Sequence, residues 1–269
     1  MKLSHSGLTA IAAVLLSAAG PGHATSVATG TLSDFRITLL DLAPDDGVAP
    51  TLELDPLSRS TAVAGAVSPG ASTFWMQQGD AAFAPVASSG QMDGTGGAAS
   101  FAGDPFGAAG ATFAVSAVGR PGFAGGTGET YVDTQPSGLT QFTLGAHTQV
   151  TFSGLASLGW NASAGAASAH GSVGLDFWQM VDSGEIDVAR DDLADGYFGD
   201  GAGALAGAAS RQLTITFAND SDATVLLGYA VDVFADASEV AVPVDEPAGA
   251  ALLLAAAAPL AWLARRRRR

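Results

Sequence analysis

Leu213–Ser221 reads LTITFANDS, and its first five residues alternate strictly between apolar and polar side chains. Successive side chains of a β-strand point to opposite faces, so this pattern predicts a strand with one buried face and one solvated face. The same alternation returns at Val225–Val233, Phe35–Leu39 and Val150–Phe152. Turn-forming residues separate these runs, for example at Pro44–Gly47.

The interior of the chain lacks the 3.6-residue period of a long amphipathic helix. The sequence therefore predicts an all-β fold, an antiparallel β-sandwich of which the jelly-roll is one form. Residues 25–235 are predicted to form this body as one domain, with short strands and long loops in the glycine-rich stretch Gly90–Gly128. The chain has no cysteine, and a body of this size can bury a sufficient core without disulfides.

Charge is distributed very unevenly along the chain. Lysine and arginine total 11 and aspartate and glutamate total 26, but Lys2 and Arg265–Arg269 lie at the two ends. Between these ends lie five basic and 26 acidic residues, which give a formal charge of −21. Such a surface repels phosphate backbones, so no nucleic-acid partner is expected.

Residues 1–24 have the three parts of a secretory signal peptide. Lys2 supplies the positive start, Leu8–Ala19 the short apolar core, and Gly22–Ala24 the small residues before a cleavage site. Cleavage is predicted after Ala24, and an uncleaved anchor or a buried helix is the alternative. We therefore expect the body to be exported.

The other end of the chain predicts a membrane anchor. Residues 236–247 are predicted to be a linker, and Ala248–Ala264 carries no charge over 17 residues. As a helix this segment would be about 26 Å long, close to the thickness of the hydrocarbon core of a bilayer. The topological stop that follows consists of Arg265, Arg266, Arg267, Arg268 and Arg269. These charges resist translocation, so the tail is predicted to stay in the cytoplasm.

This ending resembles the PEP-CTERM sorting signal of Gram-negative bacteria, in which a Pro-Glu-Pro motif precedes an apolar helix and a basic cluster. Glu246 and Pro247 match the motif, whereas Asp245 stands where the family has its first proline. The resemblance implies an exosortase as partner, which would remove the tail. It also implies a producer of exopolysaccharide, with the protein delivered from the cytoplasmic membrane to the cell surface or extracellular matrix.

Three stretches of the body also look like those of uncharacterised exported proteins that carry this tail. They are Phe35–Pro50, Leu144–Leu155 and Leu213–Ser221. This resemblance implies no activity.

Catalytic residues are scarce in the predicted mature chain. Only His147 and His170 remain as histidines after the signal peptide, and no G-x-S-x-G motif is present. Ser168 and Ser172 flank His170, but neighbours along one strand do not make a catalytic triad by themselves. His147 lies in Gly145–Thr148, which predicts a hairpin turn. The chain is therefore predicted not to be an enzyme.

Acidic residues gather in DSGEIDVARDDLADGYFGD, residues 182–200. Calcium prefers several oxygen ligands, and the candidates here are Asp187, Asp191, Asp192 and Asp195. The spacing does not match an EF-hand, because Leu193 stands where an oxygen ligand is required. The alternative is a solvated acidic loop that keeps the protein soluble.

Aromatic side chains that remain exposed could stack on sugar rings. Tyr197 and Phe198 follow Gly196 beside the acidic run and are predicted to lie in a loop, whereas Trp75, Trp160, Trp178 and Tyr131 are expected mostly in the core. Taken together, the sequence predicts an exported surface or matrix protein associated with exopolysaccharide. The alternative is a carbohydrate-binding module, in one version dependent on calcium.

Overall fold

The computed structural model describes residues 25–68, 70–120, 125–134, 140–162, 167–181, 184–198 and 205–239. In this part of the chain every regular element is a β-strand, and all the strand pairings are antiparallel. The predicted signal peptide, sorting motif, C-terminal helix and arginine tail lie outside the described residues. Within those residues there is no helix with the length and apolar character needed to span a bilayer.

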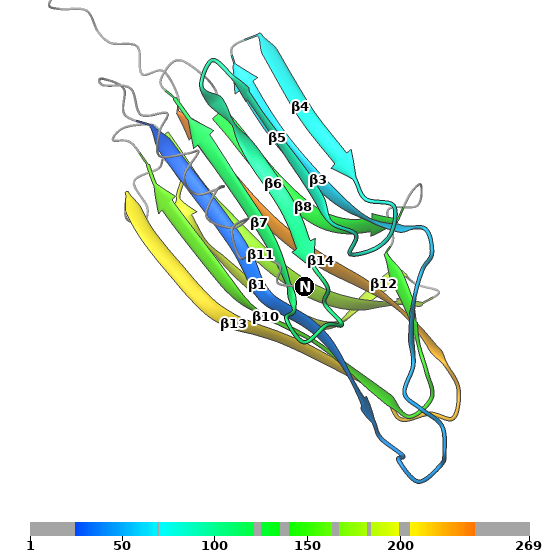
Figure 1. Cartoon of the computed structure of the whole chain (residues 1–269). Coiled ribbons are helices and arrows are strands. Elements are labelled where there is room, and N and C mark those ends of the chain that lie inside the picture. Colours follow the sequence, from blue (N-terminus) through cyan, green and yellow to red (C-terminus); the bar gives the residue numbers. More distant parts are fainter. Residues whose placement is uncertain are drawn as a thin grey trace, which may run out of the picture.

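The strands form two sheets (Figure 1). Sheet A has six strands in the order β13 (Ala206–Asn219), β10 (Thr148–Asn161), β1 (Ser26–Asp41), β7 (Ala111–Gly119), β6 (Thr95–Gly103) and β5 (Val86–Met92).

Sheet B has eight strands, six of them in the order β12 (Gly184–Tyr197), β11 (Ala167–Val181), β14 (Val225–Glu239), β8 (Gly125–Thr134), β3 (Ser58–Ser68) and β4 (Ala71–Gln78). Its other two strands extend one end of β14, where β9 (Gln141–Leu144) pairs with both β14 and β2 (Leu52–Leu54).

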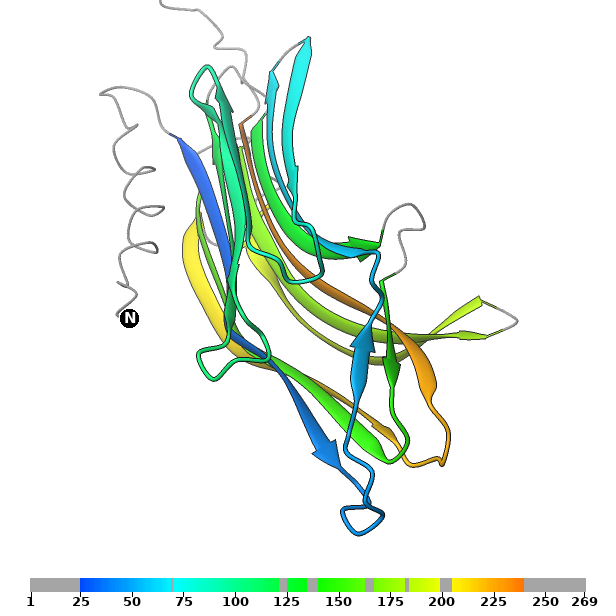
Figure 2. The ribbon, with the colours of Figure 1, turned by 45° about the vertical axis from the view of Figure 1, so that its right-hand side comes forward.

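Figure 2 shows the two sheets as stacked layers that curve in the same direction. The outer face of sheet B lies on the concave side of the curve. Buried residues from both sheets form one hydrophobic cluster between them. The predicted all-β, antiparallel class is confirmed, and the two layers are compatible with a β-sandwich. The alternating runs are also confirmed as strands: Leu213 and Ile215 in β13 are buried while Thr214 and Thr216 are exposed.

One part of the core is aromatic. Eight large rings fill it, each at most 6 % exposed: Phe35, Phe83, Phe101, Phe113, Phe142, Phe152, Phe177 and Tyr229. Neighbouring rings lie close together, with centroids 4.5 Å apart for Phe101 and Phe113 and 4.7 Å for Phe152 and Phe177. The second of these contacts joins sheet A to sheet B, because Phe152 belongs to β10 and Phe177 to β11.

Elsewhere the two sheets approach so closely that glycine is required. A Cβ atom on Gly97 of β6 would lie 1.8 Å from the carbonyl oxygen of Thr127 in β8. A Cβ on Gly126 of β8 would lie 2.1 Å from the carbonyl oxygen of Gly96. In this region backbone faces backbone, and no side chain can be inserted without moving the sheets apart.

This contact explains the glycine-rich stretch and corrects its interpretation. Residues 90–128 were expected to form short strands and long loops. Instead they contain β6 and β7, each nine residues long, and the start of the ten-residue β8. Glycine is abundant here because the layers touch, and only in part because the chain turns.

The boundary of the body also differs from the prediction. β14 continues to Glu239, so the predicted linker at 236–247 begins four residues too early. Ala237 and Glu239 are buried on the inner side of β14. The Oγ of Ser26, at the start of β1, donates a hydrogen bond to Oε1 of Glu239 at 3.1 Å. The beginning and the end of the described body are therefore joined.

Both open edges between the sheets are closed by a side chain that binds a backbone group across the gap. At one edge, Oδ2 of Asp191 in β12 accepts the backbone N–H of Thr214 in β13 at 2.8 Å, and Oδ1 binds Nη2 of Arg211 at 2.5 Å. At the other edge, Oγ of Ser88 in β5 donates to the carbonyl of Trp75 in β4 at 2.6 Å. The indole of Trp75 occupies the space beside Gly90.

We expect Gly97→Ala to destabilise the body by about 3 kcal/mol or more, because the new methyl group meets backbone that cannot rotate away. The matched control is Gly159→Ala in β10, where the only atom near an added Cβ is the side-chain Oγ1 of Thr29, at 2.9 Å, and no backbone atom lies within 4 Å. That change should alter stability by less than about 1 kcal/mol. Denaturant unfolding of both variants tests this; equal effects would contradict a backbone-limited contact.

Candidate ligand face of sheet B

The outer face of sheet B carries an unusual number of ionisable side chains. Residues of β11 alternate between the core and this face, so Val173, Leu175 and Phe177 are buried while His170 and Asp176 point outward. Register pairs His170 with Asp236 of β14 and Gly174 with Asp232. On the next strand, Glu129 of β8 lies opposite Phe234 of β14. The face therefore places carboxylates on three adjacent strands.

One arginine stands among several of these carboxylates. Nε of Arg190 in β12 donates to Oδ1 of Asp192 at 3.2 Å. Asp176, Asp187 and Asp232 are close enough to Arg190 to interact with its charge. We call Asp176, Asp187, Asp192, Asp232 and Arg190 the carboxylate row. One cation faces four acids, so the row carries excess negative charge.

Burial and mutual repulsion raise the pKa of the inward members of this face. The pKa of Asp232 is raised chiefly by burial, with repulsion from Asp192 adding to it and Arg190 opposing it. Burial also leads the raised pKa of Asp176, followed by repulsion from Asp187. The pKa of Glu129 is raised by burial and then by Asp232. These carboxyl groups hold their protons more tightly in the folded chain than in the unfolded chain.

A second group lies on the same face. The ring of His170 lies 4.8 Å from that of Phe198 and 5.9 Å from that of Phe234. Nδ1 of His170 stands 3.9 Å from Oδ2 of Asp236 and is a buried atom that has no hydrogen-bond partner among the described residues. Burial raises the pKa of Asp236, and the neighbouring His170 lowers it in part. We call His170, Phe198, Phe234 and Asp236 the histidine group.

Hydroxyl groups continue the histidine group along the strands. Ser168 and Ser238 lie opposite one another, and their Oγ atoms are 2.6 Å apart. Serine hydroxyls both donate and accept hydrogen bonds, and a carboxylate accepts them. The region thus combines an aromatic ring with hydrogen-bond donors and hydrogen-bond acceptors.

The aromatic side chains proposed for stacking are placed very differently. Tyr197 is the last residue of β12 and only 7 % exposed, so the expectation of a loop tyrosine is wrong. Phe198 follows the strand and is 55 % exposed. Trp75, Trp160, Trp178 and Tyr131 are half-buried. Of the six aromatic residues considered, only Phe198 offers an open ring.

The described part of the acidic run forms strand β12 (Gly184–Tyr197) and not the expected loop. Asp187, Asp191, Asp192 and Asp195 all lie in β12. Asp187 and Asp195 are eight residues apart, a separation of about 26 Å in an extended strand, so the four carboxylates cannot surround one ion. Asp191 binds Arg211, Asp192 binds Arg190, and Oδ1 of Asp195 accepts the backbone N–H of Gly196. In the described part of the chain, no three or more His, Cys, Asp or Glu side chains are placed so that they could hold one metal ion together.

His147 lies where the sequence placed it, in a turn, with a positive φ of 48°. Its Nε2 is 2.8 Å from Oδ1 of Asp222. The turn is not a hairpin, because β9 belongs to sheet B and β10 to sheet A. It carries the chain from one layer to the other.

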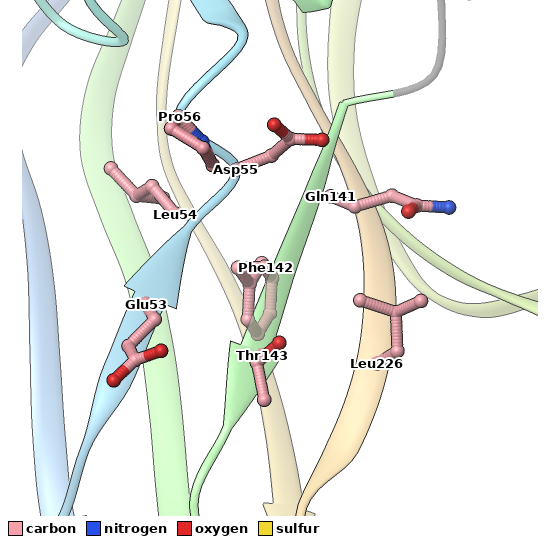
Figure 3. A pocket seen from close by; sticks show the side chains of 8 residues that line it. All are labelled: Glu53, Leu54, Asp55, Pro56, Gln141, Phe142, Thr143 and Leu226. Carbon is pink, nitrogen blue, oxygen red and sulfur yellow. The ribbon is translucent and has the colours of Figure 1, made fainter.

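A pocket of about 280 Å³ opens where β2, β9 and β14 meet (Figure 3). Its lining residues are Glu53, Leu54, Asp55, Pro56, Gln141, Phe142, Thr143 and Leu226. Asp55 already accepts the backbone N–H of Leu57, and Phe142 is part of the core. The pocket offers two carboxylates and one amide, and its only aromatic ring is buried. It provides fewer ways to hold a sugar than the outer face of sheet B.

Sequence reasoning singled out Phe198 but missed its partners. The sequence alone places His170 beside Ser168 and Ser172, and it predicts that Asp236 belongs to the linker. The signal that could have paired them is the alternation of β14, which extends past Ala235 and places Asp236 on the polar side. The carboxylate row was similarly hidden, because Asp176 and Asp232 come from separate strands.

Carboxyl groups with a raised pKa bind protons more tightly in the folded state than in the unfolded state. The fold is therefore stabilised when the pH falls below the raised pKa, and it loses this stability when the pH rises above it. We expect a higher Tm at mildly acidic pH than at pH 8. Asp232→Asn should raise the Tm at pH 8 and weaken its pH dependence, since it also relieves Glu129 and Asp176. Each kcal/mol added to the free energy of unfolding would raise the Tm by about 2–4 °C. Calorimetry across pH tests this, with exposed Asp80→Asn as control; equal responses would contradict the assignment.

The face therefore presents two adjoining groups, one dominated by carboxylates and one by an exposed aromatic ring. The chain matches no protein-family model, no curated protein and no solved structure. Its function has to be argued from these side chains and from the two ends of the chain.

Proposed function

We propose that the protein is a non-enzymatic exported protein that is displayed at the cell surface or in the extracellular matrix of a Gram-negative bacterium. Its two sheets form a β-sandwich body, and its C-terminal segment acts as a transmembrane helix and a PEP-CTERM-like sorting signal. An exosortase recognises Glu246 and Pro247 and removes the tail. Whether the sandwich is of the jelly-roll type stays a prediction.

The observation that carries this proposal is the order of features after the body. An uncharged stretch of 17 residues is followed at once by five arginines, in a chain whose other basic residues are six in number. Such an arrangement favours a stop-transfer segment with its basic end in the cytoplasm. The bond between Ser26 and Glu239 places side by side the two ends of the described body, beyond which the predicted signal peptide and tail lie.

We expect the double variant Glu246→Ala, Pro247→Ala to remain tethered with its tail intact. The matched control changes two nearby residues, Val242→Ala and Val244→Ala, and should be processed normally. Intact-mass measurement of both proteins, isolated from a host that has the processing enzyme, compares the presence of residues 248–269. Loss of the tail at the normal rate in the double variant would count against the motif.

A second function is favoured by the histidine group: binding of a glycan, which we propose takes place on the outer face of sheet B. The exposed ring of Phe198 can stack on the C–H face of a sugar. Asp236 can accept hydrogen bonds from sugar hydroxyls, and the Ser168 and Ser238 hydroxyls can donate or accept them.

Charge narrows the class of glycan. The carboxylate row adjoins the histidine group, and the body as a whole is strongly acidic. An anionic polysaccharide would be repelled at this face. The proposed ligand is therefore a neutral glycan or one that carries amino groups. A calcium requirement stays open to test.

Phe198→Ala should weaken glycan binding at least tenfold while leaving the fold intact, because the side chain is 55 % exposed. Phe106→Ala, which removes a ring that is 52 % exposed elsewhere on the body, is the matched control. Binding of the full-length chain is measured on a glycan array with and without a chelator. Absence of binding both with and without the chelator would contradict the glycan-binding function and leave the sorting proposal unaffected. Binding that occurs without the chelator and is lost when the chelator is added would establish a calcium requirement.

A further inference from the structure

Strand β4 (ASTFWMQQ, residues 71–78) is an edge strand with an unusual composition. It ends the order of sheet B, and among the described strands it pairs only with β3. It has no charged residue and no proline, the devices by which proteins commonly block edge strands. Phe74 is 59 % exposed and Met76 60 % exposed, and both point to the same outer face.

The surroundings of β4 extend this uncharged region. Residues 60–79 contain no charged side chain, and neither do residues 81–92, which include the neighbouring edge strand β5. The opposite edge of the two sheets is rich in charge, with Asp191 and Arg211 at its centre. Two copies of so acidic a chain repel one another over most of their surfaces, but they can approach at β4 without that penalty.

We propose that β4 pairs with β4 of a second copy of the chain, antiparallel and centred on Trp75. In this register each Phe74 lies directly opposite Met76 of the other copy, and each Ser72 lies opposite Gln78. The strand is therefore complementary to itself under a two-fold axis, as a symmetric dimer requires. A cationic partner would instead favour the acidic face of sheet B.

The energetic reason for pairing is the burial of the four exposed side chains that meet at the axis. Directly opposed residues of antiparallel strands bring their Cβ atoms to about 5 Å, and contact between a methionine sulfur and an aromatic ring is favourable. Pairing also satisfies other backbone groups along the free side of the strand, and the Trp75 carbonyl at the axis has a second lone pair for the partner beside the one that the Ser88 hydroxyl uses. The carbonyl of Trp75 already accepts the Ser88 hydroxyl, so β4 is held in place before a partner arrives.

Cysteine cross-linking tests the register, since the chain has no cysteine of its own. Ser72→Cys and Gln78→Cys are purified separately as full-length chains and then mixed under mild oxidation. The mixture should yield a disulfide-linked dimer at least ten times faster than either variant alone, because like positions would lie about 20 Å apart. Equal rates in the mixture and in the separate samples would overturn the proposed pairing.

Dissociation of the dimer gives a second measurement. Met76→Lys, at an exposed position, should raise the dimer dissociation constant at least tenfold in sedimentation experiments, whereas Leu40→Lys, also at an exposed apolar residue, should leave it unchanged. Association through the C-terminal segment would respond to neither change. A monomeric wild-type chain, or a dimer that Met76→Lys leaves intact, would overturn the proposal.

Discussion

The close approach of β6 and β8 is the constraint on which the rest of the fold depends. Where Gly97 and Gly126 face the opposite sheet, the separation of the layers is set by backbone atoms and cannot be adjusted by a change of side chain. Away from this contact the layers open enough to hold eight aromatic rings. The core is thus narrow at the glycine contact and wide at the aromatic rings. Both sheets have to curve so that their separation changes between these two places.

The two edges between the sheets are closed by side chains of different character. Sheets that meet face to face leave unpaired backbone groups at their margins. At β12 and β13 the margin is closed by the charged pair of Asp191 and Arg211, which also discourages other chains from docking. At β4 and β5 a neutral serine closes the margin and leaves apolar side chains exposed. One edge is therefore protected by charge, and the other is available for association.

How much the sequence predicts depends on where the partner of each residue lies. The period of two in Leu213–Phe217 is a local signal, and it was enough to identify strands and the all-β class. The glycines of β6 and β8 respond to a sheet that is distant in sequence, so their composition alone suggested loops. The acids of β12 were misjudged for the same reason: Asp191 faces a gap that Arg211 of β13 fills, and no pattern within residues 182–200 contains that arginine.

The candidate ligand face of sheet B was predictable from the sequence only where the signal is local. An exposed aromatic beside a glycine was recognisable at Phe198, because exposure at the end of a strand is a local property. Its association with Asp236 required the register of β11 with β14, which a single sequence does not provide. The two strands bring together residues 66 positions apart at His170 and Asp236.

The position of β14 has a mechanical consequence. This strand lies inside sheet B, bonded to β11 along one side and to β8 along the other, and the proposed C-terminal anchor would be attached beyond the end of the strand at Glu239. Tension applied through residue 240 would pull along the length of β14 and load its ladders together in shear, instead of opening them one bond at a time. A body attached to a moving cell by such a strand would resist being unravelled by drag.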